Sequence, residues 1–430
     1  MQWIEAAIAA FADWQAQPHR RTPREAVARA VPREAPATER ARVAAAVYGA
    51  VRDQRRLLFA LDVDLDARDD LAAVLVLAHC VAGGAVTPAA AAARTELPAA
   101  VFARLADVEA RLATIVDPAE RFAVRHSLPD WLAALLLREF GEDAERVVTA
   151  LGEPPPRVLR ANRLRGDRAA LAAALAEAGI STAPGRFAAD ALEVAGDDDV
   201  FATAAYRDGA FEQQDEGSQL IAQLLAPPPR GRVLDACAGS GGKTLAIAAL
   251  LGNAGEVLAA DVHAPRLQGL RQRARRAGAH NVRAVQVEAT GWSPEVERFA
   301  RAADRILLDV PCSGTGSWRR RPEARWTLTP HDLPALQRVQ DELLDRAAAA
   351  LRPGARIVYA TCSLLAAENE ERVAAALARH PELEPVRPAE ILGGAVAAPI
   401  TGADGAFLKL RPDTHGTDGF FAAVLRRPRR

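Results

Sequence analysis

Residues 233–244, with the sequence VLDACAGSGGKT, decide the fold of the second half of this 430-residue chain. A short apolar run ends on Asp235, a glycine-rich turn follows, and an alanine-rich helical segment begins after the turn. Glycine allows a tight turn and a close approach of the backbone to a ligand, and the amino end of a helix offers free N–H groups. We therefore expect a ligand site at this turn.

Three cofactor interpretations compete for the turn. A phosphate-binding P-loop requires glycine where the chain has Cys237, and a dinucleotide fingerprint that starts at Gly239 requires glycine where it has Thr244. What remains is an acidic strand end followed by Gly-x-Gly, the layout of S-adenosylmethionine methyltransferases. Asp261 ends the next apolar run, where an acidic side chain receives ribose hydroxyls in doubly wound folds. The alternative is a turn that only packs a helix against a sheet.

Short apolar runs alternate with helical segments from residue 211 to the end of the chain. This alternation predicts a parallel, doubly wound sheet that is covered by helices on both faces. We expect an α/β, Rossmann-like domain with a seven-stranded, mostly parallel sheet and ligands beyond the carboxyl ends of its strands. The expected strands are 233–236, 257–260, 282–287, 305–309 and 357–360.

Two further domains precede this α/β domain (211–430). Residues 1–125 show apolar spacings of three and four, which predicts an all-α domain. Residues 126–210 begin with helical segments, pass three prolines at 154–156 and continue with strand candidates, which predicts a small α+β module. The uncharged stretch 71–93 contains His79, Gly83 and Pro88, so we interpret it as two buried helices and a turn rather than a membrane span.

Composition is that of an ordinary globular protein. Half of the residues are apolar, a quarter are charged and the net charge is −1, which excludes a disordered, collagen-like or disulfide-stapled chain. The four cysteines form no C-x-x-C pair and no metal-ligand spacing with the eight histidines, so we expect no metal and a reducing compartment. Glu5 and Asp13 stand where a secretory signal needs a basic start and an apolar core. We expect a cytoplasmic protein that does not bind a membrane.

Two cysteines follow neighbouring strands of the expected sheet. One strand runs into DVPCSGTG (309–316) and the next into ATCSL (360–364), so Cys312 and Cys362 should face one pocket beside the glycine-rich turn. A thiolate that adds to C6 of a cytosine makes C5 able to attack a methyl sulfonium, and a base must then remove the C5 proton so that the thiolate can leave. Two thiols and Asp309, which would hold the N3 edge of the ring when protonated, fit these steps. The alternatives are inert buried cysteines and a disulfide.

Several motifs resemble those of the RNA cytosine-C5 methyltransferases. The helical domain in front is similar to the RNA-binding antitermination factor NusB, and the whole chain resembles the bacterial members that methylate one cytosine of 16S rRNA. The motifs are RANRL (160–164), QDEGSQ (214–219), DACAGSGGKT (235–244), DVPCSGTG (309–316), ATCSL (360–364) and RPDTHGTDGFF (411–421).

The resemblance implies S-adenosylmethionine as cofactor and 16S rRNA as partner, and we expect a monomer. It makes Cys362 the nucleophile, while Cys312 assists proton removal and release. Two positions depart from the family pattern, because Glu288 stands for a usual aspartate and Gly239-Ser240 for a usual Ala-Pro. The implied catalytic residues are Cys362, Cys312, Asp309 and Lys243, and the implied cofactor site consists of Asp235, Cys237, Ala238, Gly239, Ser240, Gly241, Gly242, Lys243, Asp261, Glu288 and Asp309.

Lys243 is one of only two lysines, the other being Lys409, in a chain whose usual cation is arginine. A compact ammonium at the end of the turn can approach a cofactor carboxylate or the reacting base more closely than a planar guanidinium can. We therefore expect that arginine cannot replace it.

A basic and aromatic segment follows Cys312. Arginine binds phosphates and tryptophan stacks on an unpaired base, so this segment is a candidate RNA contact, with an ordinary basic loop as the alternative. Because the methylated base must leave any stack, the small module is a candidate for holding the flanking strand. The expected RNA-binding residues are Arg319, Arg320, Arg321 and Trp326 in the segment, and Arg160 and Asn162 in the small module.

Three other functions stay open from the sequence. The same catalytic domain could modify tRNA or another rRNA cytosine. A catalytically inactive RNA-binding assembly factor is the second, and the joint presence of Cys312, Cys362 and Asp309 argues against it. A nicotinamide oxidoreductase is the third, and the incomplete glycine fingerprint argues against it.

Overall fold

The computed structural model describes residues 2–32, 34–63, 69–289 and 291–429. The chain forms two compact units, a helical unit of residues 1–153 with 318–330 and an α/β unit of residues 154–317 with 331–430. The chain therefore leaves the α/β unit after Ser317, contributes Trp318–Pro330 to the helical unit and returns at His331. The helices up to Gly152 belong to the helical unit, and the expected domain boundaries at residues 125 and 210 stay predictions.

The helical unit packs the apolar faces of its longer helices into one core, which includes Phe11, Val47 and Leu75. Two helices cover the stretch 71–93 as expected, and none of the described helices is long and apolar enough to cross a membrane. The similarity to NusB stays a prediction. The helices are α1 (Gln2–Gln15), α2 (Pro23–Ala30), α3 (Ala37–Leu61), α4 (Leu71–Ala82), α5 (Pro88–Ala92), α6 (Ala99–Ala103), α7 (Val108–Leu112), α8 (Pro118–Arg125), α9 (Asp130–Phe140), α10 (Ala144–Gly152) and α17 (Ala324–Thr327).

The α/β unit begins with a small α+β module. Its four-stranded antiparallel sheet has the order β2-β3-β1-β4, and helix α11 (Arg168–Glu177) packs its Leu171 and Leu175 against the sheet residues Leu159 and Phe211. The strands are β1 (Val158–Ala161), β2 (Thr182–Pro184), β3 (Ala191–Val194) and β4 (Phe211–Gln213). The expected α+β character of residues after 153 is therefore present.

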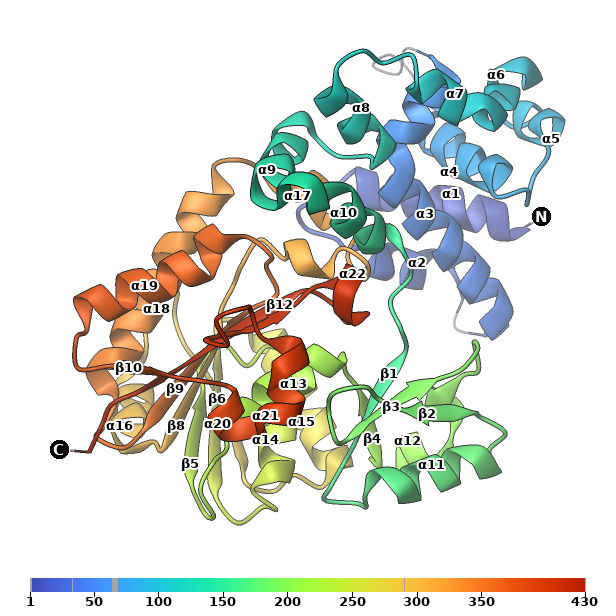
Figure 1. Cartoon of the computed structure of the whole chain (residues 1–430). Coiled ribbons are helices and arrows are strands. Elements are labelled where there is room, and N and C mark those ends of the chain that lie inside the picture. Colours follow the sequence, from blue (N-terminus) through green and yellow to red (C-terminus); the bar gives the residue numbers. More distant parts are fainter. Residues whose placement is uncertain (1, 33, 64–68, 290, 430) are drawn as a thin grey trace. The chain divides into compact units, whose positions relative to one another are not determined.

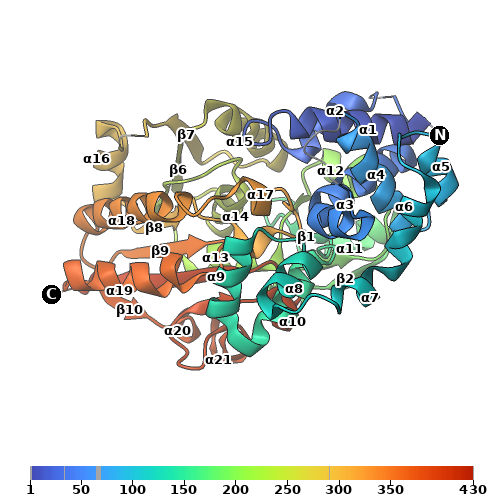
Figure 2. The ribbon, with the colours of Figure 1, turned by 90° about the horizontal axis from the view of Figure 1, so that it is seen from above.

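A large mixed sheet and its helices form the rest of the α/β unit. Its order is β10-β12-β9-β8-β5-β6-β7, with β11 paired to β12, so the sheet has eight strands and not the expected seven. The central pairs, among them β8 and β9 (Figure 2), are parallel, whereas β12 runs antiparallel to β9 and to β10. The strands are β5 (Arg232–Asp235), β6 (Glu256–Asp261), β7 (Val282–Gln286), β8 (Arg305–Asp309), β9 (Arg356–Thr361), β10 (Glu384–Val386), β11 (Leu408–Leu410) and β12 (Phe420–Arg426). The five strands expected from the sequence are all present.

Helices cover both faces of this sheet because successive strand side chains alternate between two apolar cores (Figure 1). Val233 of β5 packs with α13 (Glu216–Leu224), α14 (Gly242–Leu250) and α15 (Ala264–Ala277). Its neighbour Leu234 packs with α16 (Pro294–Ala302), α18 (Asp332–Ala350) and α19 (Glu370–Arg379) on the other face. The doubly wound architecture expected from the sequence is confirmed.

The strand order reverses next to β5. The chain runs from β5 to β6 and β7 on one side, then returns to β8 and β9 on the other. Ligands of open α/β sheets bind at the carboxyl ends of the strands where the order reverses. Asp235 and Asp309 end β5 and β8, so both stand at this point of the sheet.

Candidate active site

The glycine-rich turn connects β5 to α14 with two residues in the left-handed region. Gly239 has a φ of 53° and Gly241, the N-cap of α14, has a φ of 86°. A Cβ on Gly241 would lie 2.6 Å from Cγ of Leu270, so both the conformation and the packing require glycine there. The first N–H groups of α14 have no acceptor inside the helix and are available to a ligand.

Asp261 fixes the turn from the end of β6. Its carboxylate accepts the N–H of Gly239 at 2.7 Å and the N–H of His263 at 2.8 Å. Each carboxylate oxygen keeps a second lone pair, so this position can still accept a hydroxyl from a ligand.

Asp235 carries an acceptor that the protein leaves unused. Its Oδ2 accepts the hydroxyl of Thr244 at 2.6 Å, whereas its buried Oδ1 has no hydrogen-bond partner among the described residues. Burial raises the pKa of Asp235 from 3.8 to about 7. A buried acceptor without a partner costs free energy, so this oxygen suits a donor or cationic group of a cofactor held at the turn. The residues of the turn therefore fit the expected cofactor.

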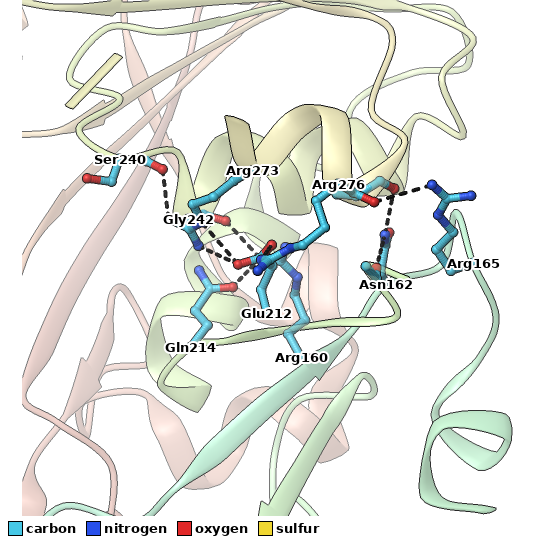
Figure 3. A network of polar contacts seen from close by, with 11 residues as sticks. Arg160, Asn162, Arg165, Glu212, Gln214, Ser240, Gly242, Arg273 and Arg276 are labelled. Carbon is cyan, nitrogen blue, oxygen red and sulfur yellow. Dashed lines mark hydrogen bonds and ion pairs between the residues drawn. The ribbon is translucent and has the colours of Figure 1, made fainter. Parts of the chain in front are cut away.

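A buried polar network contacts the glycine-rich turn from the side of the small α+β module (Figure 3). Arg160 of β1 donates to Gly242 O at 2.8 Å and to Gln214, and Arg273 of α15 donates to Ser240 O at 2.7 Å. Glu212 of β4 accepts Arg273 Nη2 at 2.7 Å and also pairs with Arg276. These contacts hold two carbonyls of the turn on the side of the small module.

Arg160 and Asn162 are therefore placed differently from the expectation that they face RNA. Arg160 is 4% exposed and Asn162 is 3% exposed. The amide of Asn162 donates at 2.8 Å to Gly209 O and to Ala277 O. Both side chains are engaged inside the α/β unit, because residues distant in sequence supply their acceptors, which are main-chain carbonyls and the side chain of Gln214.

The two cysteines lie together at the ends of β8 and β9. Their Sγ atoms are 3.4 Å apart, and both thiols are free and half-buried. The hydrogen bond with Cys312 and the charge of Lys243 lower the pKa of Cys362 against the opposing effects of burial and of the negative charge of Asp309. The same hydrogen bond and burial raise the pKa of Cys312. The pair therefore favours a thiolate on Cys362 with the proton on Cys312.

Lys243 joins the turn to the end of β8. Its Nζ donates to Asp309 Oδ2 at 2.8 Å and lies 5.5 Å from the centre of the Phe420 ring. Burial alone would lower the pKa of Lys243, but the charge and hydrogen bond of Asp309 raise it, so the ammonium stays charged. The side chain of Asp309 therefore faces the ammonium of Lys243.

The remaining cofactor candidates lie on or near the turn. Ala238 is buried, Cys237 is half-buried and Ser240 is exposed. Glu288 follows β7 and is exposed, and its main chain forms an isolated β-bridge with Gly291. Contacts of these residues with a cofactor stay predictions.

Glu368 is a residue of the site that the sequence did not single out. It is fully buried, and its carboxylate accepts the N–H of Ser313 at 2.9 Å and the hydroxyl of Ser363 at 2.6 Å. These serines directly follow Cys312 and Cys362. In the sequence Glu368 stands in an acidic run, AENEE, that resembles an ordinary helix start, so only the fold reveals its position.

The basic segment after Cys312 belongs to the helical unit. Trp318 is fully buried, and the guanidinium of Arg325 lies 5.1 Å from the centre of its ring. Trp326 packs against the helical core and donates its Nε1–H to Val51 O at 2.7 Å. Arg319 is 7% exposed, whereas Arg320 is half-buried and Arg321 is exposed. Trp326 is partly buried against the helical core and Arg319 is buried, and RNA contacts of the residues in this segment stay predictions.

Comparison with known proteins shows the relatives of this chain. The family model 16S rRNA methyltransferase RsmB/F matches residues 222–426, and a model of the RsmF/B-like, ferredoxin-like domain matches residues 128–200. A probable ribosomal RNA small subunit methyltransferase B of Bacillus subtilis is 35% identical over 316 residues, 73% of this chain and 69% of the relative. The ribosomal RNA small subunit methyltransferase B of Pseudomonas putida is 37% identical over 263 residues, 60% of this chain and 58% of the relative.

Solved structures share the fold. The crystal structure of PH0851 covers 99% of this chain and 98% of its own with a TM-score of 0.79 at 24% identity, which shows the fold alone. A methyltransferase homolog protein from Pyrococcus horikoshii covers 73% of this chain and 100% of its own, with a TM-score of 0.62 at 27% identity. The chain, with its glycine-rich turn and paired cysteines, belongs to the 16S rRNA methyltransferase RsmB/F family.

Proposed function

We propose that this protein transfers a methyl group from S-adenosylmethionine to C5 of a specific cytosine in 16S rRNA, through a covalent bond between Cys362 and C6 of the base. The observation that carries the proposal is the pair of free thiols, 3.4 Å apart, at the ends of two parallel strands beside the glycine-rich turn. A module that only binds RNA needs neither thiol.

The residues around the turn support this cofactor. Asp235 offers a buried, unused carboxylate oxygen, and the first N–H groups of α14 suit the anionic end of an amino acid. Asp261 stands where a ribose would be received. When bound, S-adenosylmethionine would supply an electrophilic methyl group. The structure of NSun6 from Pyrococcus horikoshii with SFG has the same fold, at 22% identity and a TM-score of 0.61.

Cys362 acts as the nucleophile. Its thiolate forms a bond to C6, and the electron pair of the C5–C6 double bond becomes available at C5 for the methyl group. The hydrogen bond with Cys312 and the positive charge of Lys243 lower the pKa of Cys362 against burial and the negative charge of Asp309, which favours the reactive thiolate.

Asp309, Lys243 and Cys312 serve the other steps. Because Asp309 is paired with Lys243 it acts as an acceptor, which suits the exocyclic amino group of cytosine better than N3. After methylation, the C5 proton passes to a solvent water, its electron pair restores the C5–C6 double bond, and the bond between C6 and Cys362 Sγ breaks, which releases the thiolate. We assign assistance in this step to Cys312, whose Sγ lies 3.4 Å from the leaving sulfur.

The 16S rRNA substrate rests on the names of the relatives, both of which are small subunit methyltransferases. A cytosine of tRNA or of another rRNA is the competing substrate. Bisulfite sequencing of ribosomal and transfer RNA from cells with and without the gene names the base directly. A modified cytosine lost only from tRNA in the deleted strain would refute the 16S rRNA assignment.

The covalent mechanism is tested by two single substitutions. Cys362→Ala should abolish methyl transfer and adduct formation, whereas Cys312→Ala should leave protein trapped on RNA as a band that resists denaturant. Cys80→Ala, which removes a thiol from the helical unit, is the matched control and should retain activity. Identical behaviour of the Cys312 and Cys362 variants would contradict the roles assigned here.

A further inference from the structure

Glu368 is a buried acidic residue of the α/β unit that has no role in the proposed mechanism. It lies in the short 3-10 helix η5 (Ala366–Glu368), between β9 and α19, with a side chain that is 0% exposed. Burying a carboxylate is costly unless hydrogen bonds or a cation compensate. Its partners among the described residues are neutral donors, so hydrogen bonds supply the compensation.

These donors come from both cysteine loops. Oε1 accepts the N–H of Ser313 at 2.9 Å and the amide of Gln340 at 3.0 Å. Oε2 accepts the hydroxyl of Ser363 at 2.6 Å and the hydroxyl of Ser313. One carboxylate therefore binds the residue that follows Cys312 and the residue that follows Cys362.

The carboxylate is itself held firmly. The hydroxyl of Tyr359 donates to Glu368 O at 2.6 Å, and Gln340, which contacts Oε1, also donates to Pro311 O at 3.0 Å. The loops are further joined where Leu364 N–H donates to Thr315 Oγ1 at 2.9 Å. A small shift of Glu368 would therefore move both cysteines relative to each other.

The charges around the two sulfurs are distributed unequally. The charges of Asp309 and Lys243 influence the pKa of Cys362. The charge of Glu368 influences the pKa of Cys312. The charge of Cys312 in turn raises the pKa of Tyr359. The hydrogen bond to Cys362, burial and the negative charge of Glu368 all raise the pKa of Cys312. At Cys362 the charges of Asp309 and Lys243 oppose each other, whereas at Cys312 the negative charge of Glu368 favours the protonated thiol, so Glu368 biases the shared proton toward Cys312.

We propose that Glu368 is the positioning residue of the cysteine pair, which sets the separation of the two sulfurs and keeps the shared proton on Cys312 and the thiolate on Cys362. The catalytic meaning of this inference rests on the proposed function, but the protonation preference is a property of the free protein. Glu368 acts through the two cysteines and does not contact the substrate.

The experiment measures alkylation of each cysteine by iodoacetamide in the full-length protein, without cofactor or RNA, across pH 5 to 10, with mass spectrometry of the peptides. Wild type should label Cys362 faster than Cys312 near neutral pH. In Glu368→Gln the ratio of Cys362 to Cys312 labelling should fall about tenfold, the equivalent of one unit of pKa difference. Glu368→Asp retains the charge and should restore the preference for Cys362.

Glu371→Gln is the matched control, because it makes the same chemical change on an exposed side chain of α19 close by. It should leave the labelling ratio unchanged. With substrate, Glu368→Gln should lower kcat while the KM for S-adenosylmethionine stays constant, since the cofactor is held at the other end of the site.

An unchanged labelling ratio in Glu368→Gln, or equal labelling of the two cysteines in wild type, overturns the inference. If Glu368→Gln does not fold, Ser363→Ala removes one hydrogen bond of the same carboxylate and must lower the ratio in the same direction. Failure of the proposed function is seen separately, as a wild-type protein that labels preferentially on Cys362 but neither methylates RNA nor forms an adduct.

Discussion

Asp235→Asn should stabilise the protein at neutral and alkaline pH while weakening cofactor binding. Burial raises the pKa of Asp235 from 3.8 to about 7 in the folded state, so folding is opposed once the carboxyl must ionise. The contribution of Asp235 to the free energy of unfolding of the wild type is therefore fully present below about pH 4, and it is lost as the pH rises through about 7. A shift of about three units corresponds to about 4 kcal/mol at pH 8.

Asparagine is neutral at every pH and keeps an acceptor for the Thr244 hydroxyl, which donates at 2.6 Å in the wild type. Its amide group would be buried where Oδ1 has no partner, at a cost of about 1–3 kcal/mol. The net gain expected for Asp235→Asn at pH 8 is therefore about 1–3 kcal/mol, and the gain should disappear near pH 4.

The assay is urea unfolding of wild type and Asp235→Asn in matched buffers at pH 4 and pH 8. Asp197→Asn, at an exposed position of the same unit, is the control and should change stability equally little at both pH values. Calorimetric titration with S-adenosylmethionine should show affinity reduced roughly tenfold or more, because a charge-assisted hydrogen bond is lost. An Asp235→Asn protein that is no more stable than wild type at pH 8, or a stability difference independent of pH, would refute this reasoning.

Three other substitutions test the site and the helical unit. Lys243→Arg should lower the rate of single-turnover methyl transfer by at least about tenfold although the charge is unchanged. The reason is that a planar guanidinium does not fit the space of the Lys243 side chain, which is only 10% exposed. Near wild-type turnover would disprove this. Gly241→Ala should destabilise the protein by about 1–3 kcal/mol in urea unfolding through strain and overpacking. Gly239→Ala, whose Cβ would meet no atom within 4 Å, should cost less, so the reverse order would contradict the packing argument. Trp326→Phe loses the hydrogen bond to Val51 O and should lower stability by about 1 kcal/mol, so an unchanged melting temperature would count against its structural role.

The sequence predicted the parallel part of the fold and the centre of the site well, because both depend on local patterns. Alternating apolar runs mark β5 to β9, and residues at the ends of adjacent parallel strands must come together. For this reason the sequence alone predicts that Cys312 and Cys362 lie side by side. The eighth strand, β11, is three residues long and pairs only with β12, so it leaves little pattern to detect.

Buried polar contacts were beyond reach of the sequence. Arg160 resembles an RNA contact in a basic motif, yet its acceptors belong to Gln214 and Gly242, residues that only the folded chain brings near. Glu368 stands among other glutamates, and nothing local distinguishes the buried one. Arginine and glutamate are mostly exposed in proteins, so pattern arguments assign them to the surface unless the tertiary partners are known.

The return of Trp318–Pro330 to the helical unit affects how the protein is made. The helical unit starts at the beginning of the chain, but one piece of its core is synthesised about 160 residues after Glu153. At translation rates of about 5–20 residues per second the ribosome needs roughly 8 to 32 seconds to reach that piece. Until then Val51 O lacks the indole of Trp326 and the nascent helical unit is incomplete. The N-terminal unit should therefore finish folding late, close to the time when the second cysteine loop leaves the ribosome.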